Sequence, residues 1–249
     1  MPDENEIKPF RIQVDGHRKY LFGGHWRPSV TTILSQTETA KAKASLANWS
    51  KKNPGAKEAA AARGTCIHAC CEDYLRGKPV HVPDEYASFW HGLSPYLDWF
   101  DEIWWSERPL RSDWYHLRSP DKEFSAVWSD QAGGWCGCPD LIGEIGGVKI
   151  LADFKTSNAP YRNSFPDRGD AQGFGGYRKF TKTSQQMASY AMALEERTGY
   201  RIDAALIIVS TETDKQAIFI DRDQLDLAAH KFLKRCEQYH SLFPSDEHR

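Results

Sequence analysis

A carboxylate and an ammonium group stand two residues apart at the end of an apolar run. The run covers residues 148–152 and leads through Asp153 to Lys155. Side chains alternate along a strand, so Asp153 and Lys155 would share one face. A strand that buries aliphatic side chains has no use for both charges on one face unless water or a ligand meets them there. The D-x-K tripeptide is common, however, and a salt bridge at a strand end would explain it equally well.

A second acid, Asp140, follows Pro139 and precedes another apolar run. Gly146-Gly147 separates the two runs, which predicts an antiparallel hairpin. Asp140 and Asp153 lie at similar distances from this turn and can therefore become neighbours. Two neighbouring carboxylates repel each other and are pushed toward protonation unless a cation lies between them. Because hard oxygen ligands suit magnesium and manganese, the pair predicts a divalent-metal site.

Two further pairs of polar residues have helical spacing. His68 and Glu72 lie four residues apart in an Ala-rich segment, and Gln186 and Tyr190 repeat that spacing later in the chain. Residues four apart project from one face of a helix. An amide and a phenol together could hold a phosphate or a water molecule. A single histidine on a helix is also compatible with a purely structural role.

The elements that must position these residues change type along the chain. Residues 10–22 predict two strands around Asp15-Gly16, a strong hairpin signal. Helices are expected within 28–53, 56–77, 83–104, 183–199 and 222–243. Strands are expected within 103–112, 114–119, 124–130, 135–145, 148–156, 203–212 and 216–221. This order predicts an α/β fold with a central mixed β-sheet flanked by helices.

Residues 158–184 interrupt the pattern with glycines, aromatic residues and basic residues. Long segments without regular structure in a compact domain are usually functional or disordered, so we expect a basic loop here. A solvated surface loop is the alternative interpretation. The basic residues of the segment are Arg162, Arg168, Arg178, Lys179 and Lys182, against the acids Asp167 and Asp170.

Composition limits the class of protein. The chain has 249 residues, of which 40% are apolar, and no window approaches the roughly 18 consecutive apolar residues of a membrane span. The acidic, polar N-terminus does not resemble a signal peptide, so a cytoplasmic protein is expected. The net charge of -2 argues mildly against a general polyanion binder but says little about a local groove.

Taken in order, the motifs are G-x-x-x-H-x-x-x-E at Gly64 to Glu72, P-D at 139–140, D-x-K at 153–155 and Q-x-x-x-Y at 186–190. This series resembles the PD-(D/E)XK nuclease superfamily, in particular its RecB-like branch, over roughly residues 60–220. The branch includes phage exonucleases and the mitochondrial genome maintenance exonuclease. The resemblance implies a restriction-endonuclease-like core over 61–249, preceded by an N-terminal hairpin and helical region over 1–60.

The resemblance also implies roles for individual residues. His68, Asp140, Asp153 and the main-chain carbonyl of Phe154 would bind Mg²⁺ or Mn²⁺. Lys155 matches the catalytic lysine, and Glu72 would orient the site or contact a second metal ion. Gln186 and Tyr190 match the motif at the scissile strand, with Gln185 as an alternative register for the glutamine. DNA contacts are expected from Tyr190 and from the five basic residues of 158–184.

The cysteines do not fit a disulfide framework, and free thiols in the core are the expected reading of all six. Several members of the branch hold an iron–sulfur cluster with one upstream cysteine and three near the C-terminus. Only Cys236 follows the Q-x-x-x-Y segment, so no such cluster is predicted. A zinc site stays open as an alternative for Cys66, Cys70, Cys136 and Cys138.

The leading functional hypothesis is therefore a metal-dependent DNA exonuclease that acts on single strands or free ends. A compact nuclease without helicase motifs would suit phage or bacterial DNA processing, including repair or recombination. A structure-selective endonuclease on the same fold is the runner-up, and a non-catalytic protein that binds DNA ends is a hypothesis from another class. No membrane association is expected, and the sequence does not indicate protein partners or the direction of digestion.

Overall fold

The computed structural model of the protein describes residues 11–14, 17–22, 25–106, 108–109, 127–129 and 131–244. The strand expected at 114–119 lies outside these residues. So do most of the strand expected at 124–130 and the turn residues Asp15-Gly16.

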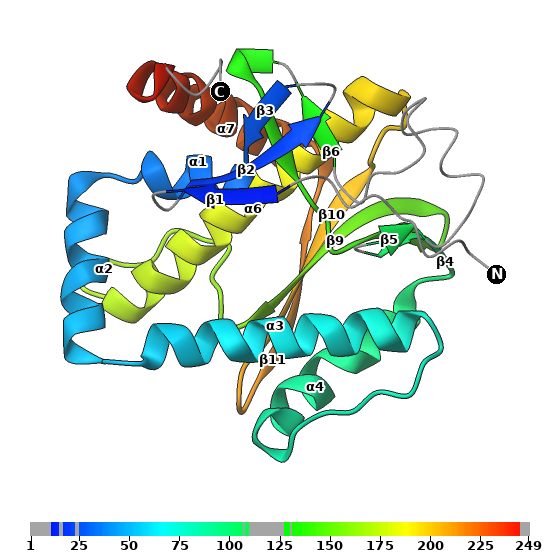
Figure 1. The fold of residues 1–249 in the computed structure, drawn as a ribbon. Coiled ribbons are helices and arrows are strands. Elements are labelled where there is room, and N and C mark those ends of the chain that lie inside the picture. The colour runs from blue at the N-terminus through cyan, green and yellow to red at the C-terminus, as the bar shows by residue number, and fades with distance from the viewer. Residues whose placement is uncertain are drawn as a thin grey trace.

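The centre of the fold is a six-stranded mixed β-sheet, which confirms the predicted α/β class (Figure 1). Its strand order is β11-β10-β9-β8-β4-β5, in which β9 pairs parallel to β10 and antiparallel to β8. The strands are β4 (Glu102–Ser106), β5 (Arg108–Pro109), β8 (Leu141–Ile145), β9 (Val148–Thr156), β10 (Ala204–Ser210) and β11 (Lys215–Ile220).

Helices cover both faces of this sheet, and the two hydrophobic clusters follow the alternation of side chains along β9. Ile150, Ala152 and Phe154 pack with α3 (Ala56–Leu75) and α4 (Ala87–Leu93) on one face. Leu151 packs on the other face in the cluster that contains α1, α6 and α7. These three helices span Val30–Gln36, Ala171–Thr198 and Arg222–Leu242.

Two small sheets lie beside the central one. The predicted N-terminal hairpin is present as β1 (Arg11–Val14) and β2 (His17–Phe22), and β3 (His25–Pro28) adds a third strand. The second small sheet pairs β6 (Val127–Ser129) with β7 (Trp135–Gly137). Helix α2 (Ala40–Lys52) connects α1 with α3 and buries none of its residues.

The single helix expected over 83–104 is wrong. The segment forms the 3₁₀ helix η1 (Asp84–Tyr86), the short α4 and a second 3₁₀ helix, η2 (Ser94–Trp99). Pro95 stands in the first turn of η2, where its missing N–H ends the α-helical hydrogen bonding. A third 3₁₀ turn, η3, covers Gln131–Gly133.

The expected loop over 158–184 is also shorter than predicted. It ends at Asp170, whose side chain caps α6 by accepting a hydrogen bond from the Gly173 N–H at 2.7 Å. Residues 171–182 are therefore helical and lengthen the helix predicted over 183–199 by 12 residues at its N-terminal end. Among the described residues no helix is long and apolar enough to cross a membrane.

Candidate active site

The two acids of the predicted hairpin meet at the end of the central sheet. Gly146 and Gly147 both have positive φ, as a two-residue hairpin turn requires, and this turn sets the register Leu141↔Ala152. The next position outward brings Asp140 level with Asp153. Asp140 is 9% exposed and Asp153 only 1%, so both carboxylates are buried.

Where the pairing of β8 and β9 ends, the Asp140 side chain accepts a hydrogen bond from the backbone of β9 in place of a main-chain carbonyl. Its Oδ2 accepts a hydrogen bond from the Phe154 N–H at 2.7 Å. This bond satisfies a buried main-chain donor and holds the carboxylate against the strand that carries Asp153. The position of Asp140 is therefore determined by the backbone of β9.

His68 reaches the same point from the opposite face of the sheet. Its Nε2 lies 2.9 Å from the carbonyl oxygen of Phe154, and its Nδ1 lies 3.5 Å from Oδ1 of Asp140. Gly64, one turn before His68, faces the strand end, where a Cβ atom would lie 3.9 Å from Oγ1 of Thr156, an ordinary packing distance. The site thus combines one helix from each layer with the strand between them.

Lys155 and Gln186 approach Asp153 on the α6 side of the sheet. The Lys155 ammonium forms an ion pair with Oδ2 of Asp153. The amide Nε2 of Gln186 donates to Oδ1 of Asp153 at 3.2 Å and also lies 3.0 Å from the Tyr190 hydroxyl. Both oxygens of this buried carboxylate therefore face a donor.

The glutamine that reaches Asp153 is Gln186 and not its alternative, Gln185, which is buried elsewhere on α6 with 6% exposure. Tyr190 is 3% exposed and lies so close to Gly137 that a Cβ atom there would come within 2.0 Å of the ring. A direct DNA contact from Tyr190 does not fit this position. Its hydroxyl instead holds Gln186 in place.

The charges at the site are unbalanced. Burial raises the pKa of Asp140 to about 6, although His68 opposes the shift, and the charge of Asp153 raises it further. Burial by itself would lower the pKa of Lys155, but the carboxylates of Asp153 and Asp140 outweigh it and raise that pKa. Ionisation of both carboxylates beside a single ammonium group is therefore unfavourable in this buried site.

The donors present fit a hard divalent cation. They comprise two carboxylates and one main-chain carbonyl, whose oxygens suit Mg²⁺ or Mn²⁺, and one imidazole, a softer nitrogen ligand. The 2.9 Å between His68 Nε2 and the Phe154 carbonyl is close to the roughly 3 Å between neighbouring ligands of an octahedral ion with bonds of about 2.1 Å. Within the described part of the chain, however, no three His, Cys, Asp or Glu side chains form a ready-made metal cluster. The fit therefore depends on the carbonyl of Phe154 and on release of Asp153 from Lys155.

Glu72 lies one helical turn beyond His68 and forms an ion pair with Arg76 at 3.4 Å. This contact is at the C-terminal end of α3. The predicted role of Glu72 in orienting the site stays a prediction.

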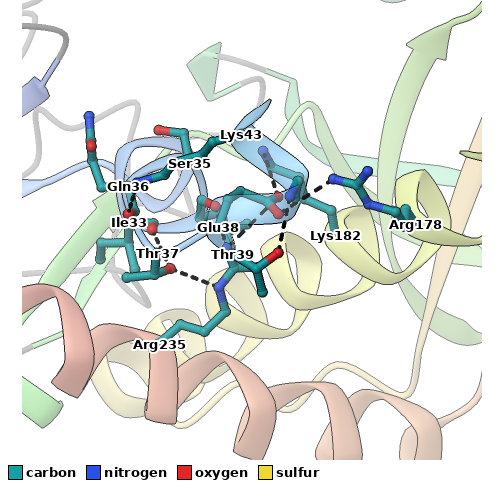
Figure 2. Close-up of polar contacts among 12 residues, drawn as sticks. Ile33, Ser35, Gln36, Thr37, Glu38, Thr39, Lys43, Arg178, Lys182 and Arg235 are labelled. Carbon is teal, nitrogen blue, oxygen red and sulfur yellow. Dashed lines mark hydrogen bonds and ion pairs between the residues drawn. The ribbon is translucent and has the colours of Figure 1, made fainter. Parts of the chain in front are cut away.

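Two of the predicted DNA-binding residues are engaged by an acid of the protein itself. Glu38, at the corner between α1 and α2, receives ion pairs from Arg178 and Lys182 of α6, each at 3.6 Å, and from Arg235 of α7 at 3.9 Å (Figure 2). Arg235 Nε also donates to Thr37 Oγ1 at 2.8 Å. The cluster fastens the start of α2 to both helices of the layer.

The other three predicted basic residues differ in their surroundings. Arg162 pairs with Asp170 at 3.4 Å, and Arg168 is exposed. Lys179 donates to Oγ of Ser157 at 2.8 Å, directly after the strand that bears Asp153. Of the five, Lys179 is the one tied to the end of β9.

One cation near the site was not predicted. Arg63 donates from Nη2 to Oδ1 of Asn158 at 2.9 Å, on the other side of the same strand end. In the sequence it is a single arginine on an Ala-rich helix, a pattern typical of a solvated face. The signal available in the sequence was that Arg63 directly precedes Gly64, the first residue of the G-x-x-x-H-x-x-x-E motif.

No protein with a curated description matches the chain. One similar solved structure is a protein from Eubacterium rectale that carries the provisional name of an exonuclease. It is 13% identical, with 72% of this chain and 68% of that chain covered and a TM-score of 0.42. The family model of the PD-(D/E)XK nuclease superfamily matches residues 34–248, and the chain belongs to that superfamily.

Proposed function

We propose that the protein is a divalent-metal-dependent deoxyribonuclease that hydrolyses phosphodiester bonds from free, single-stranded DNA ends. The observation that supports hydrolysis is the meeting of Asp140, Asp153, His68 and Lys155 at one strand end. Membership of a nuclease superfamily supports the same chemistry. Mg²⁺ or Mn²⁺ is the proposed cofactor.

His68, Asp140, Asp153 and the Phe154 carbonyl would hold the metal ion. When bound, the metal supplies an acidified water and neutralises charge on the phosphate. Lys155 places a positive charge where the phosphate oxygens gain negative charge in the transition state. Gln186, held by Tyr190, keeps the Asp153 carboxylate oriented while Lys155 turns from it to the substrate.

The proposed preference for DNA ends is based on the position of helix α2. This helix has no buried residue, yet Glu38 fastens its beginning and α3 follows directly from its end. It crosses from one layer to the other as a strap at the side of the molecule (Figure 1). One of its faces exposes Lys41, Ala44, Ser45, Asn48, Trp49 and Lys52, which together line an open surface hollow. Lysines beside an exposed tryptophan suit a single strand, which offers both phosphates and unpaired bases.

A second aromatic group supports single-stranded substrates. Phe165 is 69% exposed and lies 5.2 Å from the ring of Phe174 and 5.3 Å from that of Tyr177. These rings stand in the basic segment between Arg162 and Arg178. Unpaired bases stack on such exposed rings irrespective of sequence.

Replacing Trp49 with alanine should weaken binding of single-stranded DNA by about 10-fold, because one stacked base contributes roughly 1–3 kcal/mol. Binding of blunt duplex DNA should change far less, since its bases are already stacked. Fluorescence anisotropy with matched single-stranded and duplex oligonucleotides measures both effects.

Leu46→Ala is the matched control, because Leu46 lies on the same helix, is 58% exposed and does not line the hollow. This variant should bind both DNA forms as the unaltered protein does. Equal losses of affinity in the two variants would show that no particular face of α2 binds DNA. The proposed role of α2 in binding single strands would then be wrong.

The experiment that tests the function itself compares a linear single strand with the same strand circularised, in Mg²⁺ or Mn²⁺. We expect loss of the linear form only, no cleavage in EDTA and strongly reduced cleavage by Lys155→Ala. An end label on either side then gives the direction of digestion.

Cleavage of both forms at similar rates would favour a structure-selective endonuclease on the same site. Binding of the linear form without cleavage of either would favour a protein that binds DNA ends. Neither outcome is compatible with an exonuclease.

A further inference from the structure

Two basic side chains, Arg63 and Lys179, come from opposite helical layers and lie on either side of the strand end that carries the site. Arg63 of α3 donates to the Asn158 side chain at 2.9 Å, and Lys179 of α6 donates to the Ser157 side chain at 2.8 Å. Ser157 and Asn158 are the two residues that directly follow β9. Arg63 and Lys179 therefore flank the point at which the chain leaves the active site.

The two cations act on each other without an acid between them. Burial lowers the pKa of Lys179, and the charge of Arg63 lowers it further. Burial also lowers the pKa of Arg63, opposed by the fields of Tyr86 and Glu212. Among the described residues, no carboxylate lies within ion-pair distance of either side chain, whereas Arg178, Lys182 and Arg162 all have one. Like charges held close together in this way suit an anion.

Arg63 is also held in a fixed orientation. Its guanidinium lies 4.3 Å from the centre of the Phe89 ring, which limits its movement. Its Nε is buried and has no hydrogen-bond partner within the described structure. This donor lies out of reach of solvent, so a ligand would contact the Nη2 edge of the guanidinium, which donates to Asn158 at the surface. A planar, oriented guanidinium is well suited to bind phosphate oxygens.

The position relates the pair to the substrate strand. Lys179 precedes Gln186 by seven residues, which is two turns and about 10 Å on the same face of α6. A DNA strand whose scissile phosphate lies at Asp153 and Gln186 would pass this pair with an adjacent part of its backbone.

We propose that Arg63 and Lys179 form a second phosphate subsite, which binds a DNA phosphate next to the scissile one. This inference rests on the proposed nuclease function and assigns a role to Arg63, which no motif indicated. The bound phosphate can be internal to the strand or the monophosphate at its end. Both present the same anionic oxygens, and the experiment separates them.

The test measures binding of short single-stranded oligonucleotides by anisotropy in EDTA, where no cleavage occurs. Arg63→Gln and Lys179→Gln should each weaken binding roughly 10-fold, the size of one charge-assisted hydrogen bond. Arg63→Lys should recover part of the loss because it restores the charge but not the planar group. Lys231→Gln, an exposed position on α7, is the control and should change affinity less than two-fold.

Oligonucleotides with one neutral methylphosphonate, moved stepwise along the strand, identify the bound phosphate. A methylphosphonate at one position should weaken binding of the oligonucleotide to the unaltered protein. The same methylphosphonate should not weaken binding to Arg63→Gln any further. If instead removal of the terminal phosphate produces this pattern, the subsite recognises strand ends. A purely structural Arg63 would leave the effect of every methylphosphonate unchanged, and that result would overturn the proposal.

Thermal denaturation checks that the variants fold. If Arg63→Gln does not, Lys179→Gln carries the same test, because much of the Lys179 side chain lies at the surface and only its end is partly buried. This test is independent of the test of the proposed function. If the protein cleaves no DNA but shows this phosphate dependence, the subsite is supported and the nuclease function is wrong. A protein that cleaves linear DNA with no dependence on Arg63 or Lys179 keeps the nuclease and loses the subsite.

Discussion

Replacing Lys155 with alanine should reduce cleavage of linear single-stranded DNA by about a thousand-fold, with DNA binding retained. Loss of one preorganised charge at a developing negative charge has an effect of this size. The same change leaves Asp153, which is 1% exposed, without its ion pair. The metal-free protein should therefore also lose about 3 kcal/mol of its free energy of unfolding, because a buried charge loses its partner. Single-turnover cleavage and urea denaturation in EDTA measure the two effects.

Lys149→Ala is the matched control, because Lys149 lies on the same strand at the opposite end and packs over the Tyr200 ring. It should cleave DNA at the rate of the unaltered protein. Mg²⁺ or Mn²⁺ should return part of the stability that Lys155→Ala loses, since a divalent cation compensates the charge of Asp153. Full activity of Lys155→Ala would show that the site has been assigned to the wrong lysine.

The core of the site was predictable because its determinants are local. A glycine pair between two apolar runs specifies a two-residue turn, and the turn specifies which residues of the two strands face each other. Counting outward from Gly146-Gly147 was therefore enough to bring Asp140 and Asp153 together. The four-residue spacing of Gln186 and Tyr190 was similarly sufficient, because it places both on one face of a helix.

The beginning of α6 was not predictable from local preference. Gly173, Gly175 and Gly176 disfavour a helix, so the segment resembled a loop. The structure shows why two of these glycines occur: a Cβ at Gly173 would lie 2.2 Å from the Asp170 carboxylate, and one at Gly176 would lie 2.8 Å from the Pro160 carbonyl. They allow the preceding chain to pack closely against the helix, a tertiary requirement that a sequence window does not contain.

Charge pairing over long sequence separations was also inaccessible. Arg178 and Lys182 looked free to bind DNA, but their partner, Glu38, lies about 140 residues earlier and is brought to them only by the fold (Figure 2). The opposite holds for Arg63, which resembled a solvated residue until the fold placed it beside β9. Which cations remain available to a ligand therefore had to be read from the structure.

Asp140→Asn should make the metal-free protein more stable at pH 8 while abolishing cleavage. The folded-state pKa of Asp140, about 6, lies above its ordinary value of 3.8. Between these two values the folded protein binds more protons at Asp140 than the unfolded chain, so its stability falls as pH rises through this range. Above about pH 6 the ionised carboxylate therefore costs on the order of 3 kcal/mol, and asparagine avoids this cost while keeping an oxygen for the Phe154 N–H.

The measurement is urea denaturation in EDTA from pH 4 to pH 8. The unaltered protein and Asp140→Asn should have similar stability near pH 4 and separate progressively up to about pH 6. Asp167→Asn, at an exposed carboxylate, should show no such separation. Adding Mn²⁺ at pH 8 should stabilise the unaltered protein more than Asp140→Asn, because binding to the folded state alone raises stability and the variant has lost a proposed ligand. A variant that is less stable than the unaltered protein at pH 8, or gains equally from Mn²⁺, would mean that Asp140 holds the fold together and does not await a cation.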